Sequence, residues 1–194
     1  MSDPQSPSRR PVPPTAAATG LTPYVVGLDL SLTASGVASS RGWTETVFST
    51  GKADATLAQR RERLVAISTV VHGLAHHSDL VVIEAPAFSR TTGHMHDRSG
   101  LWWAVVHGLM SRDIPVVEVT ATTLKKYATG KGNATKPDMR VELYRRAGVD
   151  LRDDNQVDAV WLAHLGCHLL GRPLLNLPQT HLVALDKVAR PVVA

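Results

Sequence analysis

The sequence predicts an α/β domain built on a mixed β-sheet. Two observations support this prediction: three short strand-like runs follow one another with tight connections, and later strand-like runs alternate with helical segments. Short connections favour an antiparallel meander, whereas helical crossovers between strands imply a parallel half. The chain has 194 residues, 43% of them hydrophobic and 20% charged, which suits one globular domain with a sizeable core.

The first half of the chain supplies the meander and one crossover. Residues 24–30 form a continuous apolar run, and residues 35–40 and 43–50 follow as two further strands joined by a tight turn. Apolar side chains recur at helical spacing across residues 55–77, which predicts an amphipathic helix. Residues 78–86 are then typical of a buried strand.

The second half continues the alternation of helices and strands. Residues 99–112 form a strongly apolar helix, which is also our candidate for a subunit interface, and residues 114–120 form a further strand. Three more helices are expected over residues 120–130, 136–148 and 154–170. The helices between strands predict that the last strands run parallel.

The ends of the chain differ in composition from the middle. Residues 1–22 are rich in Pro, Ser and Ala and predict a disordered tail, residues 23–172 form the domain, and residues 173–194 are expected to be an irregular C-terminal tail. The single cysteine, Cys167, cannot form an internal disulfide, so a reducing, cytoplasmic location is the default expectation. No apolar run approaches the ~18 residues of a membrane span.

Carboxylates stand at functionally suggestive places in this pattern. Asp29 and Glu84 each end an apolar strand, and ligand sites in α/β sheets gather beyond the carboxyl ends of strands. Asp154 and Asp158 are four residues apart and share one face of the last helix. Acids that converge in this way suit hard divalent cations, Mg²⁺ or Mn²⁺, and two such ions can hydrolyse a phosphodiester. The alternative is structural, since an acid at a helix start often caps the helix.

Four segments in order, "GLDLSLTASGVA", "VVIEAPAF", "LKKYATGKGNATKPDM" and "DDNQVDAVWLA", resemble the RuvC Holliday-junction resolvases of the ribonuclease H-like superfamily. The resemblance runs from about residue 24 to 170 and is closest to divergent members from bacteriophages and actinobacteria. It implies a five-stranded mixed sheet flanked by helices, a homodimer, branched DNA as substrate, and hydrolysis with two Mg²⁺ ions, which Mn²⁺ can replace. The implied enzyme is a crossover-junction endodeoxyribonuclease in recombination, repair or phage DNA processing.

The family's first, second and last acids correspond here to Asp29, Glu84 and Asp158. The remaining ligand has three candidates. The best known members place an acid or histidine at the position of Asn155, whereas divergent members place an acid at Asp154. Asp154 lies one turn before the last acid on the same helix face, whereas Asp153 is rotated by about 100° and suits a capping role. Asn155 offers only a neutral carbonyl, so Asp154 is preferred.

Basic residues are concentrated before the acidic helix. The chain carries a formal charge of +4, whereas residues 125–152 contain eight basic and three acidic side chains, a net of +5. We expect Lys125, Lys131 and Lys136 to contact DNA phosphates. A solvated helix face explains three arginines of the segment: Arg140, Arg145 and Arg146.

The segment after Glu84 is a second candidate DNA contact. Phe88 and Arg90 could stack on or grip a distorted strand, and Phe88 resembles the aromatic residue that family members insert at the junction centre. Small residues after the first acid would also let a nucleic-acid backbone approach it closely. These are Ser31, Thr33, Ser35 and Gly36.

Three other functions compete with strict junction cleavage. The motif "GLDLSLTASG" also resembles the phosphate-binding hairpin of sugar kinases and actin-like ATPases, but the chain shows neither their second phosphate hairpin nor an adenosine loop. A non-catalytic module that binds DNA structures would not need the acids. A broader nuclease for branched or flap DNA would share every feature above, since specificity depends on loop geometry.

Overall fold

The computed structural model describes residues 10–11, 22–86 and 95–191. Five strands form the mixed sheet predicted from the sequence: β2 (Val25–Asp29), β3 (Ala34–Ser39), β4 (Trp43–Phe48), β5 (Leu80–Glu84) and β6 (Val116–Val119). β2, β3 and β4 pair as an antiparallel meander, whereas β5 pairs parallel with both β2 and β6. The order β4-β3-β2-β5-β6 places β2 and β5 side by side at the centre.

A short sixth strand, β1 (Arg10–Pro11), was not predicted. It pairs antiparallel with the start of β4, with Arg10 opposite Thr44 and Pro11 opposite Trp43. A proline is compatible with this position because an edge strand needs hydrogen bonds on one side only. These two residues of the expected N-terminal tail therefore join the sheet.

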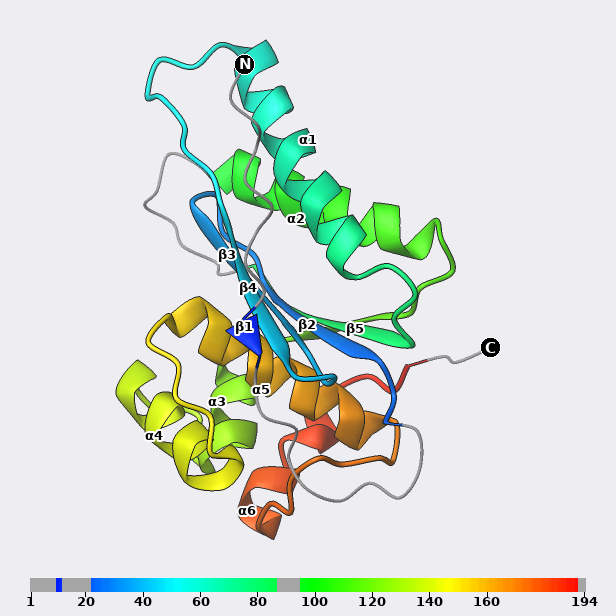
Figure 1. Ribbon diagram of the computed structural model, residues 1–194, viewed down its shortest axis with the longest axis vertical. Helices are drawn as coiled ribbons and strands as arrows, with labels where there is room; N and C mark the ends of the chain where they lie inside the picture. Colours follow the sequence, from blue (N-terminus) through cyan, green and yellow to red (C-terminus); the bar gives the residue numbers. More distant parts are fainter. Residues whose placement is uncertain (1–9, 12–21, 87–94, 192–194) are drawn as a thin grey trace.

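Helices cover both faces of the sheet (Figure 1). α1 (Leu57–Leu74) and α2 (Met95–Met110) pack on one face around a core that includes Val26, Leu28 and Ile83. α5 (Asp154–Leu169) crosses the other face, and α3 (Ala121–Thr129) and α4 (Lys136–Ala147) pack against it. The predicted helices are all present, although α1 is shorter than residues 55–77 and α2 begins before residue 99.

α5 lies unusually close to the sheet because glycines face it. A Cβ atom on Gly27 of β2 would lie 2.0 Å from the carbonyl oxygen of Ala159, and one on Gly36 of β3 would lie 2.0 Å from that of Asn155. Ser35 is also fully buried. The prediction that Gly36 leaves room for a nucleic-acid backbone is therefore wrong, because α5 occupies that space. Ser35 is equally inaccessible, and its hydroxyl donates to the Ser31 carbonyl oxygen at 2.7 Å.

The turn between α3 and α4 follows from its residues. α3 ends at Gly130, whose φ of 78° is a left-handed conformation that glycine adopts without strain. α4 then begins with a capping box, in which the Thr135 hydroxyl accepts from the Asp138 amide and the Asp138 carboxylate accepts from the Thr135 amide at 2.8 Å. The basic segment is thus a defined helical hairpin.

Within the described residues, the C-terminal segment contains two short helices, whereas an irregular tail was expected over residues 173–194. It forms α6 (Gln179–Leu182) and a 3₁₀ helix, Leu185–Lys187. Leu175, Leu177 and His181 are buried in the same core as α3 and α5. Isolated apolar residues without regular spacing do not indicate a helix or a strand in the sequence. They become part of the core only because they pack against helices from elsewhere in the chain.

Across the described ranges, no helix combines the length and the apolar composition that a membrane crossing requires.

Candidate active site

Two carboxylates stand beside each other at the carboxyl edge of the central strands. β2 and β5 are parallel and in register, with Leu28 opposite Ile83, so the next residues, Asp29 and Glu84, are neighbours. Both line a cavity of about 190 Å³. The prediction that two adjacent strands deliver their terminal acids to one place is confirmed in this geometry.

Asp158 reaches the same place from α5. The close packing of α5 on β2 and β3 sets the first turns of the helix next to the end of β2, where Asp29 pairs with Gly36. Asp158 is partly buried, and its negative charge raises the pKa of both Asp29 and Glu84. Asp29, Glu84 and Asp158 therefore form one interacting cluster.

Burial is the main cause of the raised pKa values in this cluster. Burial, aided by the charge of Asp158, raises the pKa of Asp29 to about 7. Burial, together with the charges of Asp29 and Asp158, raises the pKa of Glu84 to about 8. Burial also raises the pKa of Asp158 to about 6, against the opposing charge of Lys136. Groups whose pKa values are displaced toward neutrality are typical of functional sites.

The chemistry of the three carboxylates fits a hard divalent cation. Carboxylate oxygens are the ligands that Mg²⁺ prefers, and partly buried acids that repel one another gain most from a nearby cation. Within residues 22–86 and 95–191, no three His, Cys, Asp or Glu side chains converge closely enough, as they lie, to hold an ion. Binding would therefore require the side chains of the cluster to rotate toward the cation.

Asp153 caps α5, as the sequence predicts. Its carboxylate accepts a hydrogen bond from the Asn155 amide at 2.9 Å and one from the Thr46 hydroxyl at 2.6 Å. The Asn155 side chain is also occupied, since its amide donates to the Ala34 carbonyl oxygen at 2.9 Å. Both residues therefore attach the start of α5 to β3 and β4.

Asp154, the preferred fourth ligand, projects from the face of α5 that carries Asp158 and raises the pKa of that residue. Its carboxylate is partly exposed and forms ion pairs with Arg140 and with Lys136, the latter at 3.6 Å. A cation that used Asp154 would have to compete with these two side chains. The pairs also fasten α4 to the start of α5.

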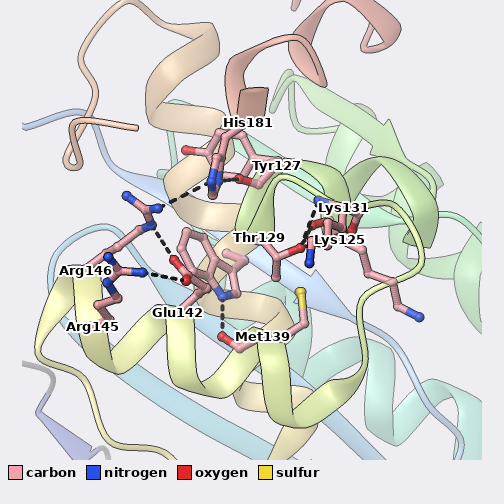
Figure 2. Close-up of polar contacts among 10 residues, drawn as sticks. Lys125, Tyr127, Thr129, Lys131, Met139, Glu142, Arg145, Arg146 and His181 are labelled. Atoms are coloured by element: carbon pink, nitrogen blue, oxygen red, sulfur yellow. Dashed lines mark hydrogen bonds and ion pairs between the residues drawn. The ribbon is translucent and has the colours of Figure 1, made fainter. Parts of the chain in front are cut away.

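The predicted DNA-binding lysines are placed unequally. Lys125 and Lys136 lie close enough to the carboxylate cluster to lower the pKa values of Glu84 and Asp158. Lys131 is exposed beyond the end of α3. Its backbone is held by Thr129, whose hydroxyl accepts from the Lys131 amide at 3.1 Å and donates to the Lys125 carbonyl at 2.8 Å (Figure 2).

The arginines at the end of α4 differ in exposure, since Arg145 is 73% exposed, as a solvated helix face predicts, whereas Arg146 is largely covered. Arg145 and Arg146 both contact Glu142, and Arg146 also donates to Nε2 of His181 at 3.4 Å (Figure 2). Nδ1 of His181 is 2.9 Å from the Tyr127 carbonyl oxygen. The C-terminal segment therefore contacts both α3 and α4, the two helices that carry most of the basic residues.

Several further candidate residues belong to the segment after Glu84 and to α2. Phe88 and Arg90 lie outside the described residues. Trp102 is buried, and its indole donates to the Glu84 carbonyl oxygen at 3.1 Å, whereas the neighbouring Trp103 is 63% exposed. The sequence analysis missed Arg98, which lines the cavity with Asp29 and Glu84. Its only sequence signal is a basic residue in the first turn of the helix that follows the second acid.

No family model matches this sequence, and no curated protein matches it. Solved structures do match, among them the following three. RuvC of Thermus thermophilus is 19% identical with a TM-score of 0.58, over 79% of this chain and 99% of that one. T. thermophilus RuvC in complex with Holliday junction substrate is 17% identical, with a TM-score of 0.61 and the same coverage. The yeast mitochondrial Holliday junction resolvase Ydc2 is 14% identical with a TM-score of 0.50, over 73% and 76% of the two chains.

The chain thus has the ribonuclease H-like fold of the RuvC resolvases, as its motifs predict. At these identities the likeness establishes the fold, and the activity of this chain depends on its own site residues.

Proposed function

We propose that this protein is a metal-dependent endonuclease that cuts four-way DNA junctions, acting in recombination, repair or phage DNA processing. The observation that carries the proposal is the meeting of Asp29, Glu84 and Asp158 at the carboxyl edge of a RuvC-like sheet, with Lys125 and Lys136 beside them. Acids alone would repel a phosphodiester, whereas acids that hold cations, flanked by lysines, attract and polarise it.

The proposed ligands are four carboxylates: Asp29, Glu84, Asp154 and Asp158. Two Mg²⁺ ions, replaceable by Mn²⁺, would supply an activated water and stabilise the leaving oxygen. The protein's own contribution is to hold the acids partly buried, so that they favour a cation over a proton as the pH rises past 6 to 8. Lys136 remains beside the acids to receive a phosphate oxygen.

DNA would reach this site along the basic hairpin of α3 and α4. Lys125, Lys131 and Lys136 are the proposed phosphate contacts, and Phe88 and Arg90 are the proposed contacts to the distorted strand. T. thermophilus RuvC has been seen with a Holliday junction substrate, which supports branched DNA as the ligand class of this fold.

We further propose a homodimer, because a four-way junction has two-fold symmetry and needs two paired nicks. The candidate interface, α2, exposes large apolar side chains that favour an apolar contact, with Trp103 63% and Met110 60% exposed. Sedimentation should therefore give about twice 20.9 kDa at micromolar concentration. A monomer that still makes paired nicks would contradict this.

One experiment tests the function and separates it from a broader branched-DNA nuclease. Labelled four-way, flap and linear DNA are incubated with and without Mg²⁺, using wild-type protein and the Asp29→Asn variant. Cleavage of the four-way junction alone, with Mg²⁺ and only by wild type, is the expected result. Equal cleavage of flaps indicates the broader nuclease, and binding without any cleavage contradicts the nuclease proposal.

A further inference from the structure

Two further cavities lie beside the carboxylate cavity. That cavity, which contains Asp29 and Glu84, shares Ser31 and Arg98 with a second cavity of about 270 Å³. The second cavity borders a third of about 350 Å³, with which it shares lining residues. The residues common to the second and third cavities are Gly51, Lys52, Ala53 and Arg63. We call the second and third cavities together the lateral groove.

The lateral groove is positively charged. Four basic side chains and one acidic side chain, Asp97, line it, a net charge of +3. The basic side chains are Lys52, Arg60, Arg63 and Arg98. A groove of this charge suits a ligand with repeated negative charges.

Two of the four cations hold the groove in shape. Arg60 forms an ion pair with both carboxylate oxygens of Asp97, and this pair connects α1 to the start of α2. Arg63 donates through Nε to the Ser49 hydroxyl at 2.9 Å and through Nη2 to the Leu32 carbonyl oxygen. These bonds join the β4–α1 connection to the turn after Asp29, so the groove is formed before a ligand binds.

Gly51 permits this arrangement. A Cβ atom at position 51 would lie 2.0 Å from Nη1 of Arg63, so only glycine lets that guanidinium lie against the backbone of the loop. Lys52, the next residue, is thereby held at the rim of the groove.

The other two cations are available to a ligand. Lys52 and Arg98 are exposed, and neither forms an ion pair with another side chain of the described ranges. Arg98 stands where the groove opens into the carboxylate cavity, and Lys52 stands further along it. They therefore lie in sequence along one path toward the acids.

The path lies on the opposite side of the sheet from the basic hairpin. α1 and α2 cover one face and α3 and α4 lie beyond the other (Figure 1). The acids at the strand ends therefore have Lys125 and Lys136 on one side, and Arg98 and Lys52 on the other. A strand that crosses the acids would meet cations both before and after them.

We propose that the lateral groove binds the sugar–phosphate backbone of a nucleic-acid strand that continues over Asp29 and Glu84, with Arg98 and Lys52 each contacting a phosphate. The proposal deepens the nuclease function, on which it rests for the direction of the strand, but the binding of the backbone is testable without cleavage. Phosphate contacts position a strand and fix its register.

Binding is measured with a fluorescent four-way junction and the Asp29→Asn protein in EDTA, over a range of KCl concentrations. Arg98→Gln and Lys52→Gln should each weaken binding and lower the slope of log K against log salt by about one, and the double variant by about two. The matched controls are Arg172→Gln and Lys187→Gln, both exposed. Arg172 follows α5, whose end packs at the opposite end of the strands from the acids.

An unchanged slope, or a change no larger than that of the controls, would overturn the proposal. Cleavage by otherwise wild-type protein provides a second readout, because Lys52→Gln should raise the junction concentration needed for half-maximal rate with little change in the maximal rate. If the groove variants lower the salt slope but wild-type protein cleaves no DNA, the nuclease function is refuted and the groove proposal stands. If wild-type protein cleaves the junction but the groove variants leave the slope unchanged, the groove proposal is refuted and the nuclease function stands.

Discussion

Asp29→Asn removes one charge from the carboxylate cluster while keeping the size of the side chain. Burial and the charge of Asp158 raise the pKa of Asp29 from 3.8 to about 7, so the folded protein binds a proton here that the unfolded chain releases. Such a group contributes stability that is full below pH 3.8 and is lost as the pH rises through 7. The shift corresponds to about 4 kcal/mol as an upper bound, which partial exposure reduces to about 2 kcal/mol.

The Asp29→Asn variant cannot ionise at this position, so it keeps its stability as the pH rises. In metal-free buffer at pH 8 we expect it to be more stable than wild type by about 2 kcal/mol, or roughly 4–8 °C in Tm for a chain of this size. The charge of Asp29 also raises the pKa of Glu84, so its removal relieves a second acid. Below pH 4 the acids are protonated in both proteins, and the difference should vanish.

Thermal melts followed by circular dichroism at pH 4, 6 and 8 in EDTA test this prediction at one protein concentration. Asp186→Asn, which changes an exposed acid in the 3₁₀ helix, is the control and should match wild type at every pH. Added Mg²⁺ should stabilise wild type at pH 8 more than the Asp29 variant. A variant less stable than wild type at pH 8, or a difference that is the same at pH 4, would refute the electrostatic reasoning.

Three further outcomes are expected. Asp154→Asn should lower the cleavage rate by orders of magnitude with little change in Tm, whereas Asp153→Asn, which keeps an acceptor for the cap of α5, should cost little of either; the reverse pattern contradicts the helix-face argument. Lys131→Ala should weaken junction binding and lower its salt slope by about one, and an unchanged slope would place Lys131 off the DNA path. Deletion of residues 1–22 removes the two-residue pairing of β1 but little else that is described, so Tm and cleavage should persist; a large fall in Tm would contradict this.

Local sequence patterns were enough to predict strands β2 to β6, helices α1 to α5 and the positions of the acids on them. Each apolar run that ends on a carboxylate became a central strand, because burial on both faces requires continuous apolar residues and tolerates a charge only at the end. Helical spacing likewise placed Asp154 and Asp158 on one face of α5, and the capping preference of aspartate identified Asp153. These are local rules, so a local pattern suffices to apply them.

Which side chains meet depends on long-range packing, which no local pattern reveals. Lys125 and Lys136 face the acids while Arg145 and Arg146 bind Glu142, although all four belong to one basic segment. The C-terminal segment becomes core, and Gly36 serves helix packing, because α5 lies against the sheet at a distance that no local pattern encodes. The lateral groove joins residues from three separate parts of the chain, two loops with the start of α1 and the start of α2. Such contacts depend on strand order and helix approach, which arise from packing the whole chain at once.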